Sequence, residues 1–382
     1  MQTPGTARAL LHGVLAGCGV LIQRLHLHSF RRFAETEFSP VAGFNLITGD
    51  NGSGKTSLLE ALHLLAHGRS FRGRVRDGLV RQGDPALQAY VEWRLPDQSS
   101  HRAGLRHTGS QWQARLNGSD LRQISQLCEA LAVISFEPGS HALVDGGSEG
   151  RRRYLDWGMF HVEHAFLPQW RRYTRAWKQR NALLRQSGSR GQLEAWEHEL
   201  AQSGEVLTQL RESYVASLQE HLVALLPQLL PSAGEMVLTL SAGWKRQELA
   251  LADALLLARE RDLSLGYTSV GPHRADLRFS LQHLPGREGL SRGQTKQLAL
   301  ALLLAQAAQL AQTLGYWPVL QLDDLGSELD RQHQQRVLEV LAASDAQVLV
   351  TGTEPPPALA AMQLPVAMFH VEHGAITGPL RP

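Results

Sequence analysis

The chain has 382 residues, of which 43% are hydrophobic and 19% charged, with a formal net charge of +2 at pH 7. This composition excludes a disordered chain, and the length favours two domains or one domain with a large insertion. The net charge is too small to indicate a nucleic-acid partner by itself. Only Cys18 and Cys128 occur, which excludes a disulfide framework and favours the cytoplasm.

The first twenty residues show no clear helix or strand pattern. An apolar run at residues 9–18 loosely resembles a secretion signal, but it is short and contains His12. We interpret residues 1–20 as an N-terminal extension without stable structure, or as the product of an assigned start codon that lies upstream of the true one. No later segment has the roughly 18 uninterrupted apolar residues that a membrane span requires. Apolar and polar residues then alternate over residues 21–27, which predicts a strand.

A phosphate-loop motif, G-x-x-x-x-G-K-[ST], occupies residues 49–56. Residues 44–48 before it predict a short buried strand, and residues 56–67 after it predict an apolar helix that ends at Gly68. The glycines let backbone N–H groups surround phosphate oxygens, and the helix N-terminus adds a partial positive charge. The predicted nucleotide-binding residues of the loop are Gly49, Asp50, Asn51, Gly52, Ser53, Gly54, Lys55, Thr56 and Ser57.

A second fragment, residues 320–324, predicts a strand that ends in two carboxylates. Lys55 would neutralise the β- and γ-phosphates, while Thr56 and Asp323 would hold Mg²⁺. Asp324 follows at the position where many cassette ATPases have a glutamate that polarises the attacking water. An aspartate is one methylene shorter, so we expect slow hydrolysis, with Lys55 and Asp324 as the catalytic residues. The two fragments together predict a site for ATP and Mg²⁺.

Short alternating segments follow the phosphate-loop helix at residues 89–95, 101–106 and 111–116, and the last ends in Asn117-Gly118. These segments predict an antiparallel β layer beside the nucleotide-binding sheet. Between residues 151 and 231 helical spacing dominates, and residues 187–191 divide the region into two long segments. That pattern is typical of a helical hairpin.

Residues 290–294, Leu-Ser-Arg-Gly-Gln, begin a long apolar helix before the carboxylate strand. They resemble the signature motif of the ATP-binding-cassette superfamily, in which Ser and Gly grip the γ-phosphate bound to the opposite subunit. Ser291, Gly293 and Gln294 are therefore predicted to contact nucleotide across a dimer. The alternative is that Ser291 is an ordinary helix N-cap.

Four further segments resemble the RecF family, whose head is related to SMC proteins. They are residues 68–72 (Gly-Arg-Ser-Phe-Arg), 151–161 (beginning Arg-Arg-Arg-Tyr-Leu-Asp), 271–276 (Gly-Pro-His-Arg-Ala-Asp) and 327–330 (Ser-Glu-Leu-Asp). The resemblance covers residues 21–374. It implies an α/β fold: an ABC/SMC-type P-loop ATPase head, with a mixed sheet plus an antiparallel β layer, and an inserted helical-hairpin arm domain. We expect the two head halves at residues 21–150 and 266–382 and the arm at 151–265.

The resemblance also implies function: an ATP-dependent homodimer that binds gapped DNA at single-strand/double-strand junctions and acts with RecO and RecR to help load RecA. Weak DNA-dependent ATP hydrolysis and a cytoplasmic location without a membrane partner belong to the same expectation. An ATPase subunit of an ABC transporter, or another SMC-like ATPase, is the alternative. Arginine side chains suit DNA phosphates. The predicted DNA-binding residues are Arg69, Arg72, Arg74 and Arg76.

Overall fold

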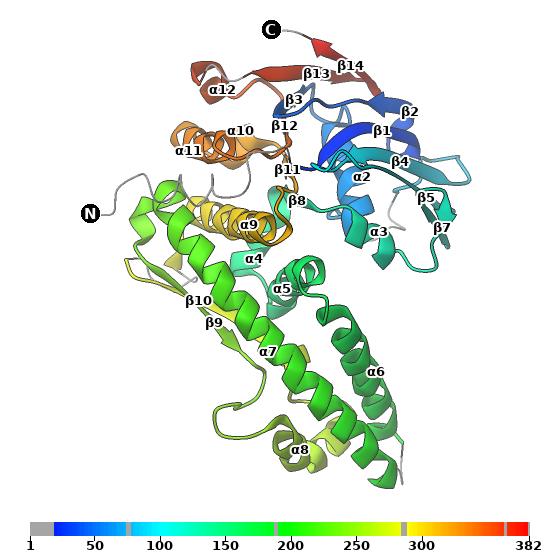
Figure 1. Ribbon diagram of the computed structural model, residues 1–382, viewed down its shortest axis with the longest axis vertical. Coiled ribbons are helices and arrows are strands. Elements are labelled where there is room, and N and C mark those ends of the chain that lie inside the picture. The colour runs from blue at the N-terminus through cyan, green and yellow to red at the C-terminus, as the bar shows by residue number, and fades with distance from the viewer. Residues whose placement is uncertain (1–18, 74–77, 187–189, 284–288, 363–364, 381–382) are drawn as a thin grey trace. The chain divides into compact units, whose positions relative to one another are not determined.

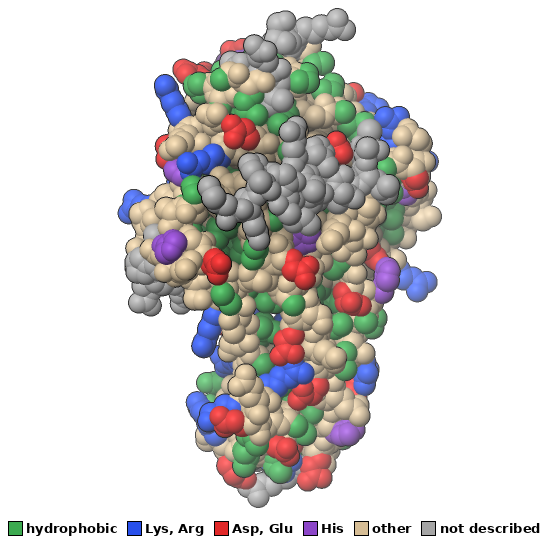
Figure 2. All heavy atoms as spheres, turned by 60° about the vertical axis from the view of Figure 1, so that its left-hand side comes forward, with side chains coloured by type: hydrophobic (Ala, Val, Ile, Leu, Met, Phe, Trp, Pro, Cys, Tyr) green, Lys and Arg blue, Asp and Glu red, His purple; other side chains and the backbone are tan. Residues whose placement is uncertain are grey.

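The computed structural model describes residues 19–73, 78–186, 190–283, 289–362 and 365–380 (Figure 1). Its contacts divide the chain into two units. Unit 1 comprises Met1–His141, Ala224–Pro231 and Ser291–Pro382, and unit 2 comprises Ala142–Val223 and Ser232–Leu290. Unit 2 begins before residue 151 and ends after residue 265, and it leaves out Ala224–Pro231, which the contacts group with unit 1. The expected arm limits of 151–265 stay a prediction. Acidic and basic side chains are interspersed on the face that Figure 2 shows, in keeping with the small net charge.

Most of the predicted N-terminal extension, residues 1–18, lies outside the described residues. Its last two residues are hydrogen bonded within unit 1. The Gly19 N–H donates to the Asp345 carbonyl (3.0 Å), and the Val20 N–H donates to the Trp317 carbonyl (2.9 Å). Gly19 and Val20, the last two residues of the predicted extension, therefore pack with unit 1.

Unit 1 contains a mixed six-stranded sheet with the strand order β14-β13-β3-β12-β11-β8. All neighbouring pairs are parallel except β13 and β14. The strands are β3 (Phe44–Thr48), β8 (Val133–Phe136), β11 (Val319–Leu322), β12 (Val348–Gly352), β13 (Val366–Glu372) and β14 (Ala375–Leu380). The carboxyl ends of parallel strands meet at one edge, so the residues that follow β3, β12 and β11 are brought together there.

The predicted antiparallel layer is confirmed as a second sheet, in the order β2-β1-β4-β5-β6-β7. Its strands are β1 (Leu21–Phe30), β2 (Phe33–Phe38), β4 (Leu87–Arg94), β5 (Ser100–His107), β6 (Trp112–Leu116) and β7 (Ser119–Asp120). Asn117 and Gly118 connect β6 to β7 with φ angles of 51° and 87°, as the predicted hairpin turn requires.

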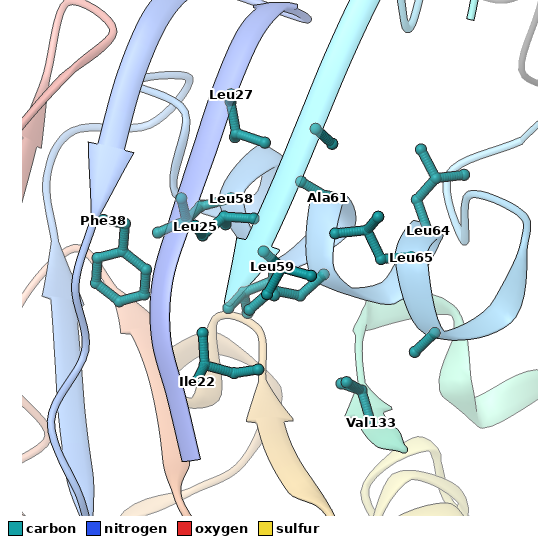
Figure 3. Packing of buried hydrophobic residues seen from close by; sticks show 14 of the residues in the cluster. Ile22, Leu25, Leu27, Phe38, Leu58, Leu59, Ala61, Leu64, Leu65 and Val133 are labelled. Atoms are coloured by element: carbon teal, nitrogen blue, oxygen red, sulfur yellow. The ribbon is translucent and has the colours of Figure 1, made fainter. Parts of the chain in front are cut away.

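The helix α2 (Lys55–His67) packs its apolar residues against the antiparallel sheet. Figure 3 shows Leu58 and Leu59 of this helix beside Leu25 of β1, and Ile22 of β1 and Leu65 of α2 belong to the same core cluster. All five side chains are at most 1% exposed, and each large apolar group buried in this way contributes about 1.5–3 kcal/mol. The phosphate-loop helix is therefore fixed along its length, and its N-terminus has a defined position. Gly68 ends the helix with φ 66°, as predicted.

The remaining helices of unit 1 are α3 (Ser125–Ala130), α9 (Arg292–Leu314), α10 (Leu325–Glu328), α11 (Arg331–Ala342) and α12 (Pro357–Ala361). By length and hydropathy alone, α9 would suit a membrane span. However, 78% of its most apolar window is buried inside the structure, as expected for a core helix.

Unit 2 contains the predicted helices, with one more break than we expected. Its elements are α4 (Ala142–Asp145), α5 (Ser148–Val162), α6 (Phe166–Leu184), most of α7 (Arg190–Leu229), α8 (Leu251–Leu265), β9 (Met236–Ser241) and β10 (Asp276–Leu281). The region before residue 187 is two helices, because Pro168 fits the first turn of α6 but would interrupt a continuous helix. The strands β9 and β10 pair with each other in a two-stranded sheet.

Two of the family-like segments meet inside unit 2. Arg151, which is 2% exposed, donates to the carboxylate of Asp276 (Nε to Oδ1, 2.7 Å). Arg211 donates to Asp156 (Nη2 to Oδ1, 2.7 Å) and to the Pro272 carbonyl (2.7 Å). A buried charge is stable only when it is paired. These residues therefore hold the elements of unit 2 together.

Candidate nucleotide-binding site

The phosphate loop lies between β3 and α2, where the sequence predicted it. Gly49 and Gly54 have φ angles of 147° and 127°, which L-residues with side chains rarely adopt. A Cβ atom on Gly49 would lie 2.2 Å from the Val371 carbonyl oxygen, and one on Gly54 would lie 2.8 Å from the Phe33 ring. Ser53 Oγ is buried and has no partner among the described residues, so a phosphate oxygen can satisfy it.

Lys55 is the first residue of α2 and is 7% exposed. Its Nζ atom donates to the carbonyls of Gly49 (2.6 Å) and Asp50 (2.9 Å). Burial lowers the pKa of this amine, and the nearby carboxylates of Asp324 and Asp323 oppose that effect. A phosphate group that accepts from Nζ would favour the charged form further.

Thr56 and Asp323 lie next to each other, as we predicted for a Mg²⁺ site. The Thr56 hydroxyl donates to Asp323 Oδ1 (2.9 Å) from the start of α2. Thr351, in the strand β12 between β3 and β11, donates to the same oxygen (2.7 Å). Hydroxyl and carboxylate oxygens are the ligands that Mg²⁺ prefers. The sequence did not assign Thr351 this contact, because only the strand order places it beside Asp323.

Asp324 follows Asp323 in a left-handed backbone conformation, with φ 51°. Its N–H donates to Thr351 Oγ1 (2.9 Å), and its carboxylate accepts from the Ser327 hydroxyl (2.5 Å). Such a conformation is unfavourable for a residue other than glycine and is often maintained at functional sites. Asp324 is partly exposed and lies at the rim of the same site.

One cavity of about 420 Å³ is lined by Lys55, Thr56, Asp323, Asp324 and Thr351. The cavity also contains three arginines, Arg31, Arg32 and Arg72, of which the sequence assigned none to nucleotide. A loop of N–H donors, a lysine, three arginines and a hydroxyl–carboxylate pair fit a triphosphate and Mg²⁺. In the sequence, Arg31 and Arg32 stand between Phe30 and Phe33, and this pattern could have indicated two arginines held in place by apolar neighbours. Both phenylalanines are buried in the structure.

The signature-like residues Ser291, Gly293 and Gln294 do not line this cavity. Ser291 caps α9: its Oγ accepts from the Gln294 N–H (3.3 Å), and the Gln294 side chain accepts from the Ser291 N–H (2.9 Å). The capping role that we considered is therefore confirmed. Ser291 and Gly293 are exposed. They remain accessible to a nucleotide held by a second chain, and that contact stays a prediction.

The structure describes two of the four predicted DNA-binding arginines, Arg69 and Arg72. Arg72 lines the nucleotide cavity, and Arg69 is exposed just after α2. Arg74 and Arg76 lie outside the described residues. On the face in Figure 2, the basic side chains of the described residues do not gather into one broad patch. The DNA contacts of Arg69, Arg74 and Arg76 stay predictions, and Arg72 is better placed for phosphate of the nucleotide.

Asp323 is 2% exposed, and burial raises the pKa of its carboxyl group, against the effect of the Thr351 and Thr56 hydrogen bonds. A group with a higher pKa in the folded than in the unfolded chain adds stability at acid pH, and this is lost as the pH rises through the folded-state pKa. The ionised Asp323 therefore destabilises the nucleotide-free protein at neutral pH.

We expect Asp323→Asn to raise the midpoint of thermal unfolding at neutral pH by roughly 2 °C, and the gain should shrink on acidification. Calorimetry without nucleotide or Mg²⁺ measures both effects. The exposed Asp345→Asn is the matched control and should change neither. A lower midpoint for Asp323→Asn at neutral pH would contradict the prediction. Asp323→Asn should also abolish the effect of Mg²⁺ on ATP affinity.

The loop, the carboxylate strand and the two sheets define an ATPase head of the ABC/SMC P-loop class. A model of the family "RecF/RecN/SMC N terminal domain" matches residues 21–377. The DNA replication and repair protein RecF of Stenotrophomonas maltophilia (strain R551-3) is 60% identical over 360 residues, which are 93% of this chain and 98% of the relative. The chain belongs to the RecF family.

Other similarities agree with this assignment. RecF of Shewanella pealeana (strain ATCC 700345 / ANG-SQ1) is 37% identical over 357 residues, with 93% of this chain and 99% of the relative covered. A solved structure of "the recombination mediator protein RecF-ATP in RecFOR pathway" superposes with a TM-score of 0.85 at 25% identity, covering 95% of this chain and 98% of that one. An Smc head domain from Pyrococcus furiosus has a TM-score of 0.56 at 14% identity and is similar in fold.

Proposed function

We propose that this protein is an ATP-dependent DNA-binding protein of recombinational repair and replication restart. The observation that carries the proposal is the contact of Thr56 and Thr351 with one oxygen of Asp323, in the cavity that contains Lys55. These residues would form a triphosphate site, and the chain is 60% identical to the DNA replication and repair protein RecF of Stenotrophomonas maltophilia. The RecF structure with ATP supports ATP as the nucleotide.

ATP would control the protein through a homodimer. Lys55 would bind the phosphates of a nucleotide that Ser291 and Gly293 of a second copy contact from the other side. A ligand that binds the dimer better than the monomer stabilises the dimer by mass action. The ATP-bound dimer would close around gapped DNA at single-strand/double-strand junctions. RecO and RecR would then help load RecA there. The proposed location is the cytoplasm, where ATP and DNA are available.

Hydrolysis would release the DNA. Mg²⁺, held by Thr56 and Asp323, would neutralise phosphate charge. The Asp324 carboxylate, once turned away from Ser327, would accept a hydrogen bond from the attacking water and orient it. Because Asp324 first has to leave this contact, and because its side chain is short, we expect slow turnover. Weak, DNA-dependent ATP hydrolysis is thus the proposed activity.

The proposal predicts that ATP strengthens binding to gapped duplex DNA at least tenfold over ADP or no nucleotide. Fluorescence anisotropy with gapped and fully paired duplexes of equal length, over a range of salt concentrations, tests this. Arginines that contact DNA phosphates release counterions, so Arg69→Ala, Arg74→Ala and Arg76→Ala should each lower the salt slope by about one.

Arg115→Ala, which removes an exposed arginine of β6, is the matched control and should leave the slope unchanged. Equal affinity for gapped DNA with ATP, ADP and neither would remove the proposed ATP control. An unchanged slope in all three arginine variants would exclude those residues as the DNA contact but would leave the ATP effect intact.

A further inference from the structure

Glu60 is a buried carboxylate in α2, the helix that follows the phosphate loop. It lies on α2 four residues after Thr56, one helical turn along the same face, and its side chain is 0% exposed. Arg31 donates to both of its oxygens, from Nε to Oε2 (3.0 Å) and from Nη2 to Oε1 (2.7 Å). The Ser70 hydroxyl also donates to Oε1. A carboxylate so buried is stable only with such partners.

Glu60 is also close to a second arginine, Arg72. The Arg72 Nη1 atom lies 3.9 Å from Glu60 Oε2, longer than a hydrogen bond, and the Arg72 N–H donates to Ser70 Oγ (2.9 Å). The Arg72 side chain is 47% exposed, against 17% for Arg31. Arg31 is thus firmly bound to Glu60, whereas Arg72 is held loosely, and both line the nucleotide cavity.

The backbone around Arg31 supports a fixed position for this residue. Its φ is 54°, a left-handed conformation that is uncommon for a residue with a long side chain. The Arg31 N–H donates to the Leu79 carbonyl (2.8 Å), and the Arg81 N–H donates to the Ser29 carbonyl (2.8 Å). The segment after α2 is therefore connected to Glu60 at both described ends, through Ser70 and through Arg31.

We propose that Glu60 is a positioning residue for the γ-phosphate. It fixes Arg31 in the cavity and keeps the Arg72 guanidinium close to the cavity through a weak ion pair. When ATP binds, the Arg72 guanidinium moves from Glu60 to the γ-phosphate. The inference rests on the proposed ATP site. A direct charge-assisted hydrogen bond to phosphate is stronger than a contact at 3.9 Å, so the transfer favours ATP. ADP has no γ-phosphate and leaves Arg72 at Glu60. Glu60 thereby contributes to the preference for ATP over ADP by keeping Arg72 at the cavity, where only ATP has a γ-phosphate to accept its hydrogen bond.

The ratio of ATP affinity to ADP affinity tests this inference without reference to hydrolysis. We expect Glu60→Gln and Arg72→Ala each to lower the ratio roughly tenfold while ADP affinity changes less than about threefold. The double variant should lower the ratio no further, because in the proposal Glu60 affects the γ-phosphate through Arg72. Isothermal titration calorimetry of the full chain with Mg²⁺ and each nucleotide measures the affinities. Arg115→Ala, an exposed arginine paired with Asp120, is the matched control.

Ser70→Ala keeps the Arg31–Glu60 ion pair and removes the hydroxyl that connects the Glu60 carboxylate to the Arg72 N–H. We expect a lower ratio of ATP affinity to ADP affinity in a protein that still folds, with a thermal midpoint lowered by a few degrees because Glu60 loses one buried hydrogen bond. An unchanged ratio in folded Ser70→Ala and Arg72→Ala, or an equal loss of ATP and ADP affinity in Glu60→Gln, would overturn the inference alone. A wild-type protein that binds neither nucleotide would overturn the proposed function as well.

Discussion

Lys55→Ala is expected to weaken ATP binding by roughly 1000-fold, or about 4 kcal/mol. In the nucleotide-free protein the Lys55 ammonium donates to two loop carbonyls, those of Gly49 and Asp50. A triphosphate offers this buried amine a far stronger partner, and charge-assisted hydrogen bonds contribute about 1.5–3 kcal/mol each. Without the amine, less positive charge would offset the repulsion between the phosphates and the carboxylates of Asp323 and Asp324. Calorimetric titration with ATP and Mg²⁺ measures the loss.

Lys245→Ala is the matched control, because Lys245 is 76% exposed and forms an ion pair with the surface residue Glu248. Its ATP affinity should equal that of the wild type. The Lys55 variant should remain folded, since the amine contacts only carbonyls of its own loop. If folded Lys55→Ala kept its ATP affinity within about threefold, the phosphate loop would not be the triphosphate site.

Ser291→Arg is expected to abolish the ATP-dependent dimer, with a dimer dissociation constant at least about 100-fold higher, while each monomer still binds ATP normally. Ser291 is exposed at the start of α9 and does not line the cavity of its own chain. A long cation at a closely packed subunit contact introduces bulk and an unpaired charge, which opposes association. Light scattering with ATP, with ADP and without nucleotide, each with Mg²⁺, measures the dimer.

The same substitution removes a helix cap, worth about 1 kcal/mol, so the cap needs its own control. Ser291→Asn keeps a good capping residue, and Ser291→Ala loses the cap without adding bulk. Both should dimerise with ATP more readily than Ser291→Arg. A Ser291→Arg protein that still dimerises with ATP would place the signature-like residues outside the interface. Reduced ATP affinity in its monomer would instead indicate that Ser291 contacts the nucleotide of its own chain.

Local patterns predicted most elements of the head because each depends on residues near in sequence. Alternation identified the antiparallel layer, and Asn117-Gly118 marked its turn. Gly68 marked the end of α2, and the loop motif identified the strand before it. The break before α6 was missed, since Pro168 is compatible with either a helix start or a kink. Local alternation also could not predict that β9 pairs with β10, because the partner of a strand is decided by residues far away in the sequence.

Glu60 illustrates the limit at the site. In the sequence it is a single charge within an apolar helix, which is a usable signal for a paired buried group, but nothing in the sequence identifies Arg31 and Ser70 as its partners. Thr351 likewise has no motif around it. Its contact with Asp323 exists because β12 lies between β3 and β11 in the sheet.

The amino-acid sequence by itself determined the class of protein and the residues nearest the phosphates, because the loop, the following helix and the carboxylate strand each have a local pattern with a specific chemistry. Only the tertiary structure decided that Thr351 holds Asp323, that Arg72 belongs to the nucleotide cavity, and that Glu60 pairs with Arg31. These contacts depend on strand order and on the packing of buried charges, which arise from interactions between residues far apart in the chain.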